Sequence, residues 1–120
     1  MTIKELVTRA MSTLTDSCDN TTYALLGLMA EVGEVAEIVA KGRRRSELRI
    51  DNDTLVTTSC DEEIVNELRE KLGSEIFDVV WFCILTCHTH GINFEEVIER
   101  GLEKLAHRKA TGTIDTHTDH

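Results

Sequence analysis

Two pairs of carboxylates are the residues of this sequence best suited to chemistry. Glu31 and Glu34 lie three residues apart in LMAEVGEVAEIVAKG, and Glu75 and Asp78 have the same spacing in KLGSEIFDVVWFCILTC. On a helix, residues three apart share a face, about 60° from each other around the axis. Carboxylates grouped in apolar surroundings repel one another and are poorly solvated, and a divalent cation commonly compensates them. The spacing therefore predicts a metal site of hard oxygen ligands formed by these four residues.

The segment that follows Glu75 is apolar on nearly all sides. Between Ile76 and Leu85 the only charged residue is Asp78. A helix of this kind is normally buried, so we expect Glu75 and Asp78 to lie inside a core. Glu31 and Glu34 border a less continuous apolar sector, and ordinary surface salt bridges are the alternative role for that pair.

Cysteine, histidine and tryptophan residues in this region offer other possible chemistry. Cys83 and Cys87, with His88 and His90 after them, could bind zinc, but a Cys-x-x-x-Cys spacing within one helix lacks the usual turn geometry. Free cysteines also pack well in cores. Trp81 could stack on a nucleobase, but a large aromatic residue in a buried run more often lies in a core or at an oligomer interface, and we favour the interface.

Helices must position these side chains, and the composition indicates an all-α fold. The 120 residues include no proline and only seven glycines. Apolar periodicity predicts helices over residues 2–14, 22–41 and 61–90, and a last helix capped by Asn93. We expect N-caps at Asn20 or Thr21 and at Asp61, helix ends at Gly42 and Gly91, and a kink or division at Gly73.

The remaining segments show no helical pattern. Residues 43–60 have no convincing period and are predicted to form a long irregular connection. Residues 1–110 are expected to form one domain, and residues 111–120 a mobile tail.

Charge and composition limit the classes of partner and location. The net charge of −9 works against binding to nucleic acid or to an anionic membrane surface. The first residues do not look like a secretory signal, and we expect no segment apolar enough to span a bilayer. The four cysteines are then expected to be reduced, in a cytoplasmic protein.

The order of these segments resembles a known family. A helical EVGEVAE segment, a later EIFDVV segment and a short basic helix are similar to the MazG-like all-α nucleoside triphosphate pyrophosphohydrolases. The family's Glu-x-x-Glu and Glu-x-x-Asp pairs correspond to Glu31 with Glu34 and to Glu75 with Asp78. The resemblance implies a bundle of four to five helices completed by oligomerisation, as a homodimer or a dimer of dimers. It also implies Mg²⁺-dependent hydrolysis of a nucleoside triphosphate to the monophosphate and pyrophosphate, with Mn²⁺ able to replace Mg²⁺.

A triphosphate needs basic side chains, because metal ions alone leave its outer phosphates poorly compensated. Lys104 and Arg108 are one helical turn apart and are the first candidates; Lys41, Lys71 and the Arg43–Arg45 cluster are the reserves. For activation of the attacking water, Glu34 is the first candidate and Glu37 the second.

The chain departs from the family pattern in one segment, and one alternative function stays open. The connection between the two acidic pairs is long for a compact member, and residues 46–60 could be a flexible insertion or a loop that covers the substrate. The alternative function is a non-catalytic helical regulatory or interaction module with a structural metal site.

Overall fold

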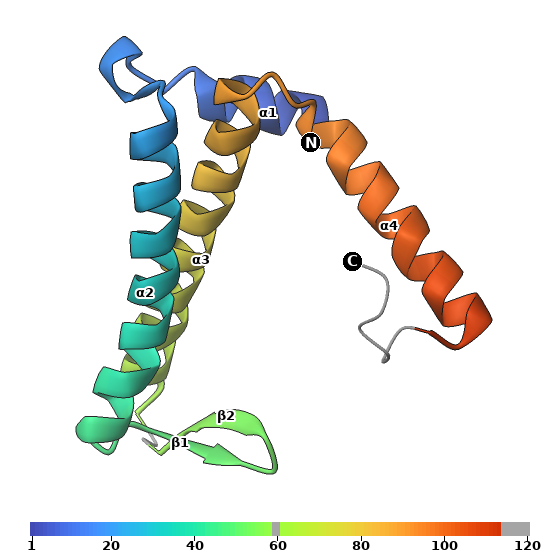
Figure 1. Ribbon diagram of the computed structural model, residues 1–120. Helices are drawn as coiled ribbons and strands as arrows, with labels where there is room; N and C mark the ends of the chain where they lie inside the picture. The colour runs from blue at the N-terminus through green and yellow to red at the C-terminus, as the bar shows by residue number, and fades with distance from the viewer. Residues whose placement is uncertain (59–60, 114–120) are drawn as a thin grey trace.

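The computed structural model describes residues 1–58 and 61–113, and the elements within these ranges are mainly helical (Figure 1). The helices are α1 (Ile3–Met11), the short 3-10 helix η1 (Asp16–Cys18), α2 (Thr21–Arg44), α3 (Glu62–Thr89) and α4 (Phe94–Thr111). The strands β1 (Leu48–Asp51) and β2 (Thr54–Thr57) form a two-stranded antiparallel sheet. The predicted all-α fold class is confirmed. Of the predicted tail, residues 114–120 lie outside the described residues, and α4 extends to Thr111.

The helices begin where local side chains satisfy their first backbone N–H groups. The Asn20, Asp61 and Asn93 side chains accept hydrogen bonds from the backbone N–H groups of Tyr23, Glu63 and Glu96, at 2.8, 2.9 and 3.1 Å. These caps confirm the predicted starts of α2, α3 and α4. Gly91, with φ +67°, follows the end of α3 as predicted.

Two predictions about glycines are wrong. The helix α3 runs unbroken through Gly73, and α2 continues past Gly42 to Arg44. Gly42 is needed inside the helix because a Cβ atom there would overlap the Leu48 side chain, which packs on it from the start of β1. Gly27 has the same role between helices, since its Cβ would overlap the ring of Phe82 on α3.

We expect Gly27→Ala to destabilise the fold and Gly33→Ala to stabilise it slightly. A methyl group at Gly27 would force the Phe82 ring to move, whereas nothing lies within 4 Å of a Cβ at Gly33. The first change should lower the free energy of unfolding by about 1–3 kcal/mol. The second should raise it by about 0.5–1 kcal/mol, because alanine favours a helix interior over glycine. Urea denaturation of both variants tests the pair, and equal stabilities would contradict the close approach of α2 and α3.

The segment predicted to be irregular forms a β-hairpin instead. The strands flank Asn52 and Asp53, whose φ angles of 50° and 58° suit the tight turn that favours right-handed strand twist. The base of the hairpin is tied by Glu47 N–H, which donates to the Gly42 carbonyl at 2.8 Å, and by Thr58, which donates to Ser46 through its hydroxyl. The runs LRID and TLVT were too short to show a period of two clearly.

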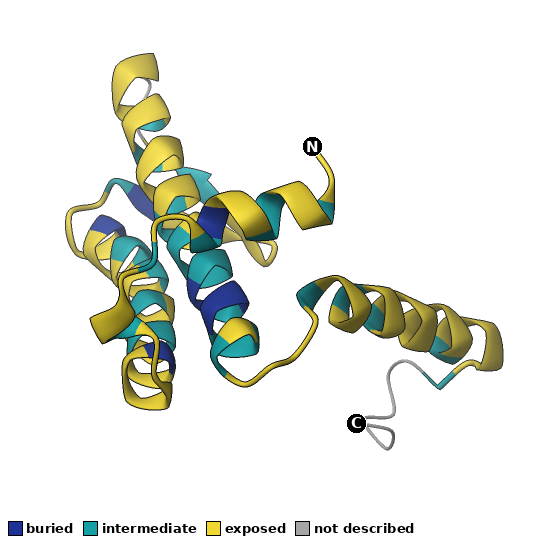
Figure 2. Ribbon diagram, turned by 90° about the horizontal axis from the view of Figure 1, so that it is seen from above, coloured by how far each residue is buried: buried dark blue, intermediate teal, exposed yellow. Residues whose placement is uncertain are grey.

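The helices α2 and α3 lie side by side, α1 crosses near the C-terminal end of α3, and α4 points away from the pair (Figure 1). A small core of Ala24 from α2 and Phe82 and Leu85 from α3 joins these two helices. Met11, Leu14, Leu28 and Trp81 are partly buried around it. The expectation that α3 is buried on all sides is wrong for the single chain, because α2 alone covers most of its length. Ile76 and Phe77 are 48% and 49% exposed, and Figure 2 shows the mostly exposed outer surfaces of the helices.

The expectation that no segment could span a bilayer needs correction. By length and composition α3 is apolar enough to do so. A single helix of this kind is weak evidence for a membrane span, since core helices pass the same test. In this fold α3 packs along α2 and carries two of the predicted metal ligands, Glu75 and Asp78.

Candidate metal centre

Three of the four predicted ligands meet between α2 and α3. Glu31, Glu75 and Asp78 each present a carboxylate oxygen, and these oxygens lie within 4.8 Å of one another. All three side chains are half-buried. Over residues 1–58 and 61–113 this is the only group of three or more His, Cys, Asp or Glu side chains close enough to share a metal ion. The packing of α2 along α3 brings Glu31 to the pair on α3.

The electrostatics of this group favour a cation. The pKa of Glu31 is raised, first by burial and then by a hydrogen bond with Glu75 and by the charges of Asp78, Glu75 and Glu34. Half-buried carboxylates that repel one another are relieved when a hard divalent cation binds their oxygens. The donor set therefore fits Mg²⁺, with room left for water and phosphate oxygens.

We expect Glu31→Gln to raise the melting temperature of the metal-free protein at neutral pH by a few degrees. A carboxyl whose folded pKa is raised binds a proton more tightly in the folded state, so wild-type stability falls as pH rises through the unfolded and then the folded pKa. The variant has no carboxyl at this position and does not lose this stability. Its higher melting temperature should therefore disappear at pH values below the ordinary carboxyl pKa, where Glu31 is protonated in both the folded and the unfolded wild type. Mg²⁺ should stabilise the wild type more than the variant. Glu103→Gln on the exposed surface of α4 is the control, and an equal gain in that variant would show only an effect of net charge.

Glu34 lies beside the group of three and not within it. It is exposed, one turn along α2 from Glu31, and lines a cavity of about 240 Å³ together with Glu37, Lys41 and Lys71. We call this the charged cavity; its other lining residues are Ile38, Gly42, Arg45, Glu47 and Leu68. The structure thus gathers four of the predicted catalytic and phosphate-binding residues next to the acidic group.

The two candidate bases differ in their environments. Glu37 accepts a hydrogen bond from Arg44 at 2.8 Å, and its pKa is lowered by this bond and by the charge of Arg44. A carboxylate stabilised in this way is a weaker proton acceptor. Among the ion pairs of the described residues, Arg44 pairs with Glu37 and none includes Glu34, and the choice of Glu34 over Glu37 as the base stays a prediction.

Lys104 and Arg108 do not reach the acidic group within one chain. They lie on α4 along an open, shallow cavity with Val97, Ile98, Gly101, Leu102 and Leu105. Because α4 points away from α2 and α3, the predicted pairing of these cations with the metal site is not formed in the isolated chain (Figure 1).

The other predicted alternatives have ordinary structural environments. Cys83 and Cys87 are half-buried on α3, and burial raises the pKa of the Cys87 thiol, as expected for a neutral packed cysteine. Trp81 packs within the chain: its indole N–H donates to the Ala10 carbonyl at 3.1 Å and to the Thr13 hydroxyl at 3.0 Å. These contacts lie within one chain, so the favoured position of Trp81 at an interface between chains stays a prediction.

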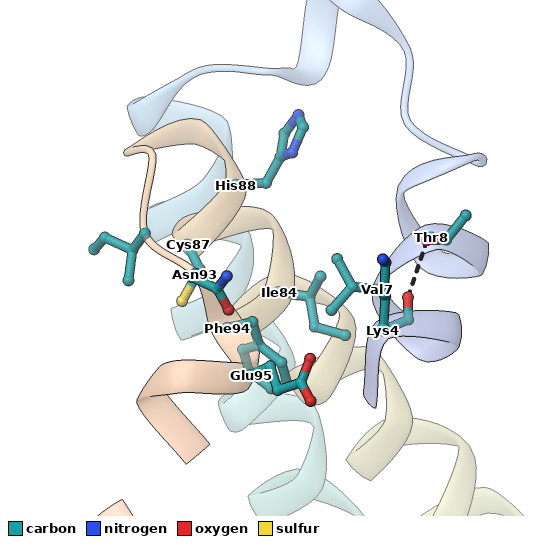
Figure 3. Close-up of a pocket in the computed structure, with 10 residues that line it drawn as sticks. Lys4, Val7, Thr8, Ile84, Cys87, His88, Asn93, Phe94 and Glu95 are labelled. Atoms are coloured by element: carbon teal, nitrogen blue, oxygen red, sulfur yellow. Dashed lines mark hydrogen bonds between the residues drawn. The ribbon is translucent and has the colours of Figure 1, made fainter. Parts of the chain in front are cut away.

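A larger cavity of about 370 Å³ lies where α1, the end of α3 and the start of α4 meet (Figure 3). It is lined by Lys4, Val7, His88, Phe94 and neighbouring residues, with Cys87 on one side. Cys87 is nine residues beyond Asp78, or about 13 Å along the helix axis. We therefore assign no part of the metal chemistry to this cavity.

Comparison with known proteins identifies the class that this fold and site define. Residues 20–113 match the model of the MazG nucleotide pyrophosphohydrolase domain, so all the predicted site residues fall within the match. The chain belongs to the MazG family. It is also 31% identical over 104 residues to the Gene 37 protein of Mycobacterium phage L5, covering 87% of this chain and 79% of that protein. No solved structure gives a significant match.

Proposed function

We propose that this protein hydrolyses ribo- or deoxyribonucleoside triphosphates to the monophosphate and pyrophosphate, using Mg²⁺ held by Glu31, Glu75 and Asp78. The observation that carries the proposal is the group of three carboxylate oxygens within 4.8 Å, next to a cavity that contains Lys41 and Lys71. Membership of the MazG family supports the reaction class. Mn²⁺ is expected to replace Mg²⁺, and the proposed setting is cytoplasmic removal of unwanted nucleotides from the pool.

In this proposal each group of residues has a separate task. Bound Mg²⁺ supplies Lewis acidity and lowers the pKa of a coordinated water. Lys41 and Lys71 bind the outer phosphates, which the acidic group would otherwise repel. Glu34 accepts the proton of the water whose oxygen attacks the α-phosphorus. The bond from that phosphorus to the bridging oxygen breaks, and pyrophosphate leaves.

We propose that the working form is a homodimer or a dimer of dimers. Along one side of α2, Leu25, Met29 and Val32 are 44%, 72% and 52% exposed, and α3 adds the half-exposed Ile76. Large apolar side chains exposed on two neighbouring helices are normally covered, and a second copy would complete a four-helix bundle. This arrangement would also allow α4 of one chain to reach the acidic group of the other.

Met29→Asp should convert the oligomer to a monomer, because it places a charge in the centre of the apolar strip. Sedimentation velocity at micromolar concentration measures the change directly. Asn66→Asp adds the same charge at an exposed position of α3 and is the control. A wild-type protein that sediments as a monomer would contradict the proposed assembly.

Release of pyrophosphate from a panel of nucleoside triphosphates, with and without Mg²⁺, tests the proposed reaction. We expect release that requires the metal ion, with the monophosphate as the second product. If no triphosphate in the panel yields pyrophosphate at any Mg²⁺ or Mn²⁺ concentration, the non-catalytic module becomes the better interpretation.

A further inference from the structure

A cavity of about 290 Å³ lies between α1 and α3, and one of its lining residues, Phe77, falls between Glu75 and Asp78 in the sequence. We call it the aromatic cavity. Phe77 and Trp81 of α3 form one wall, and Leu6, Arg9 and Thr13, from α1 and the residues after it, form the other, with Met1 and Ala10 completing the lining.

We propose that the aromatic cavity is the nucleoside subsite, in which the base of the substrate stacks on Phe77 and Trp81. The inference rests on the proposed function and adds to it the place and chemistry of base binding. It is carried by the juxtaposition of three features along α3: the charged cavity with Lys71, the acidic group with Glu75 and Asp78, and the aromatic cavity with Trp81.

The order of these features along α3 matches the order of groups in a nucleoside triphosphate. Lys71, Glu75, Asp78 and Trp81 follow one another at intervals of four, three and three residues, so each is a neighbour of the next on the surface of α3. Trp81 is about 60° around the helix axis from Asp78, and Phe77, four residues before Trp81, lies further round on the same side. The ten residues from Lys71 to Trp81 span about 15 Å. With the α-phosphate at Glu75 and Asp78, the outer phosphates lie toward Lys71. The sugar and base must then extend the opposite way, toward Trp81.

The Trp81 ring is held in a fixed position that suits stacking. The indole of Trp81 is fixed by its two hydrogen bonds to Ala10 and Thr13 and by an edge contact with Phe82, with ring centroids 5.1 Å apart. Because its N–H is already used, the indole offers a base only its apolar surface. Phe77, four residues before Trp81, is half-exposed and extends the same wall, so both rings can contact one face of a base. Stacking of this type tolerates any base, since every base has a π-face.

Arg9 is the charged residue of the cavity lining and sets the expected preference among bases. A guanidinium group only donates hydrogen bonds, so it can bind a base that presents a carbonyl oxygen. The Thr13 hydroxyl donates to the Ala10 carbonyl at 2.7 Å and accepts from Trp81, which leaves it little capacity for the base. We therefore expect Arg9 to favour the bases that carry a carbonyl oxygen, which are uracil, thymine, cytosine and guanine, over adenine.

Fluorescence of Trp81, the single tryptophan of the chain, tests the proposal without any need for turnover. The protein with Mg²⁺ is titrated with uridine monophosphate, with adenosine monophosphate and with ribose 5-phosphate. We expect saturable changes in emission with the two nucleotides and little change with ribose 5-phosphate, which lacks a base. Phe77→Ala should weaken binding of uridine monophosphate by about tenfold, and Arg9→Ala should reduce the difference between the two nucleotides.

Phe94→Ala, which removes a ring from the cavity in Figure 3, is the matched control and should leave nucleotide binding unchanged. Equal responses to ribose 5-phosphate and to the nucleotides would overturn the proposal. So would a Phe77→Ala variant that changes the sedimenting species and not the nucleotide affinity, since a second copy would then cover the cavity. Triphosphate hydrolysis with no dependence on Phe77 would leave the proposed function standing while removing this subsite. Binding of monophosphates that depends on Phe77, without any hydrolysis of triphosphates, would support this subsite and contradict the proposed function.

Discussion

Exchange of Asp78 for asparagine should lower the rate of pyrophosphate release by on the order of a hundredfold or more. Mutation of residues that only hold a metal ligand in place already lowers metal affinity or activity by about 10–100-fold, and Asp78 is a proposed ligand itself. Asparagine keeps the size of the side chain but replaces an anionic oxygen of the group of three by a neutral amide. The half-buried helix should therefore remain intact while the affinity for Mg²⁺ falls. Steady-state kinetics, calorimetric titration with Mg²⁺ and far-UV circular dichroism measure these three quantities.

Glu75→Gln should behave in the same way, and Glu103→Gln, an exposed change on α4, should retain wild-type turnover. The two outcomes separate a loss of metal binding from a general effect of charge. An Asp78→Asn enzyme that keeps more than about a tenth of wild-type activity would show that the reaction does not depend on this carboxylate.

The acidic group could be predicted from the sequence because its geometry depends on short-range features. The three-residue spacings act within α2 and within α3, and the packing of these two long helices brings the pairs together. The same holds for the helix starts, where Asn20, Asp61 and Asn93 bond to backbone groups only two or three residues away. Glu34 shows the limit of the pattern, because helical spacing placed it near Glu31 but did not determine its exposure.

Features that depend on distant contacts could not be predicted in the same way. Gly42 looks like a helix end until Leu48 is seen packed against it. Trp81 bonds to Ala10 across 71 positions of sequence, so the aromatic cavity appears only when α1 is placed against α3. The exposure of Ile76 and Phe77 has the same origin, because an apolar sequence cannot reveal how many neighbours a helix has within its own chain. The hairpin did have a local signal, the Asn52-Asp53 turn followed by the largely β-branched run TLVT.

The direction of α4 leads to the second large effect that we expect. Lys104 and Arg108 lie on α4, away from Glu31, Glu75 and Asp78 of their own chain. If they serve the phosphates, as the family resemblance implies, they must do so in the partner chain of the proposed oligomer. Replacement of both by alanine should then reduce kcat/KM by on the order of a hundredfold, with the affinity for Mg²⁺ unchanged.

Mixing this double variant with the Asp78→Asn variant, after joint unfolding and refolding, should restore activity. In a mixed dimer one of the two sites receives intact carboxylates from one chain and intact cations from the other. Random assembly gives half mixed dimers, so about a quarter of all sites should be functional. Neither variant alone, refolded under the same conditions, should show this recovery. If the mixture stays as inactive as its components, the two sets of residues do not meet between chains. If the double variant keeps wild-type kcat/KM, Lys104 and Arg108 are solvated surface charges and the phosphates are held by Lys41 and Lys71 alone.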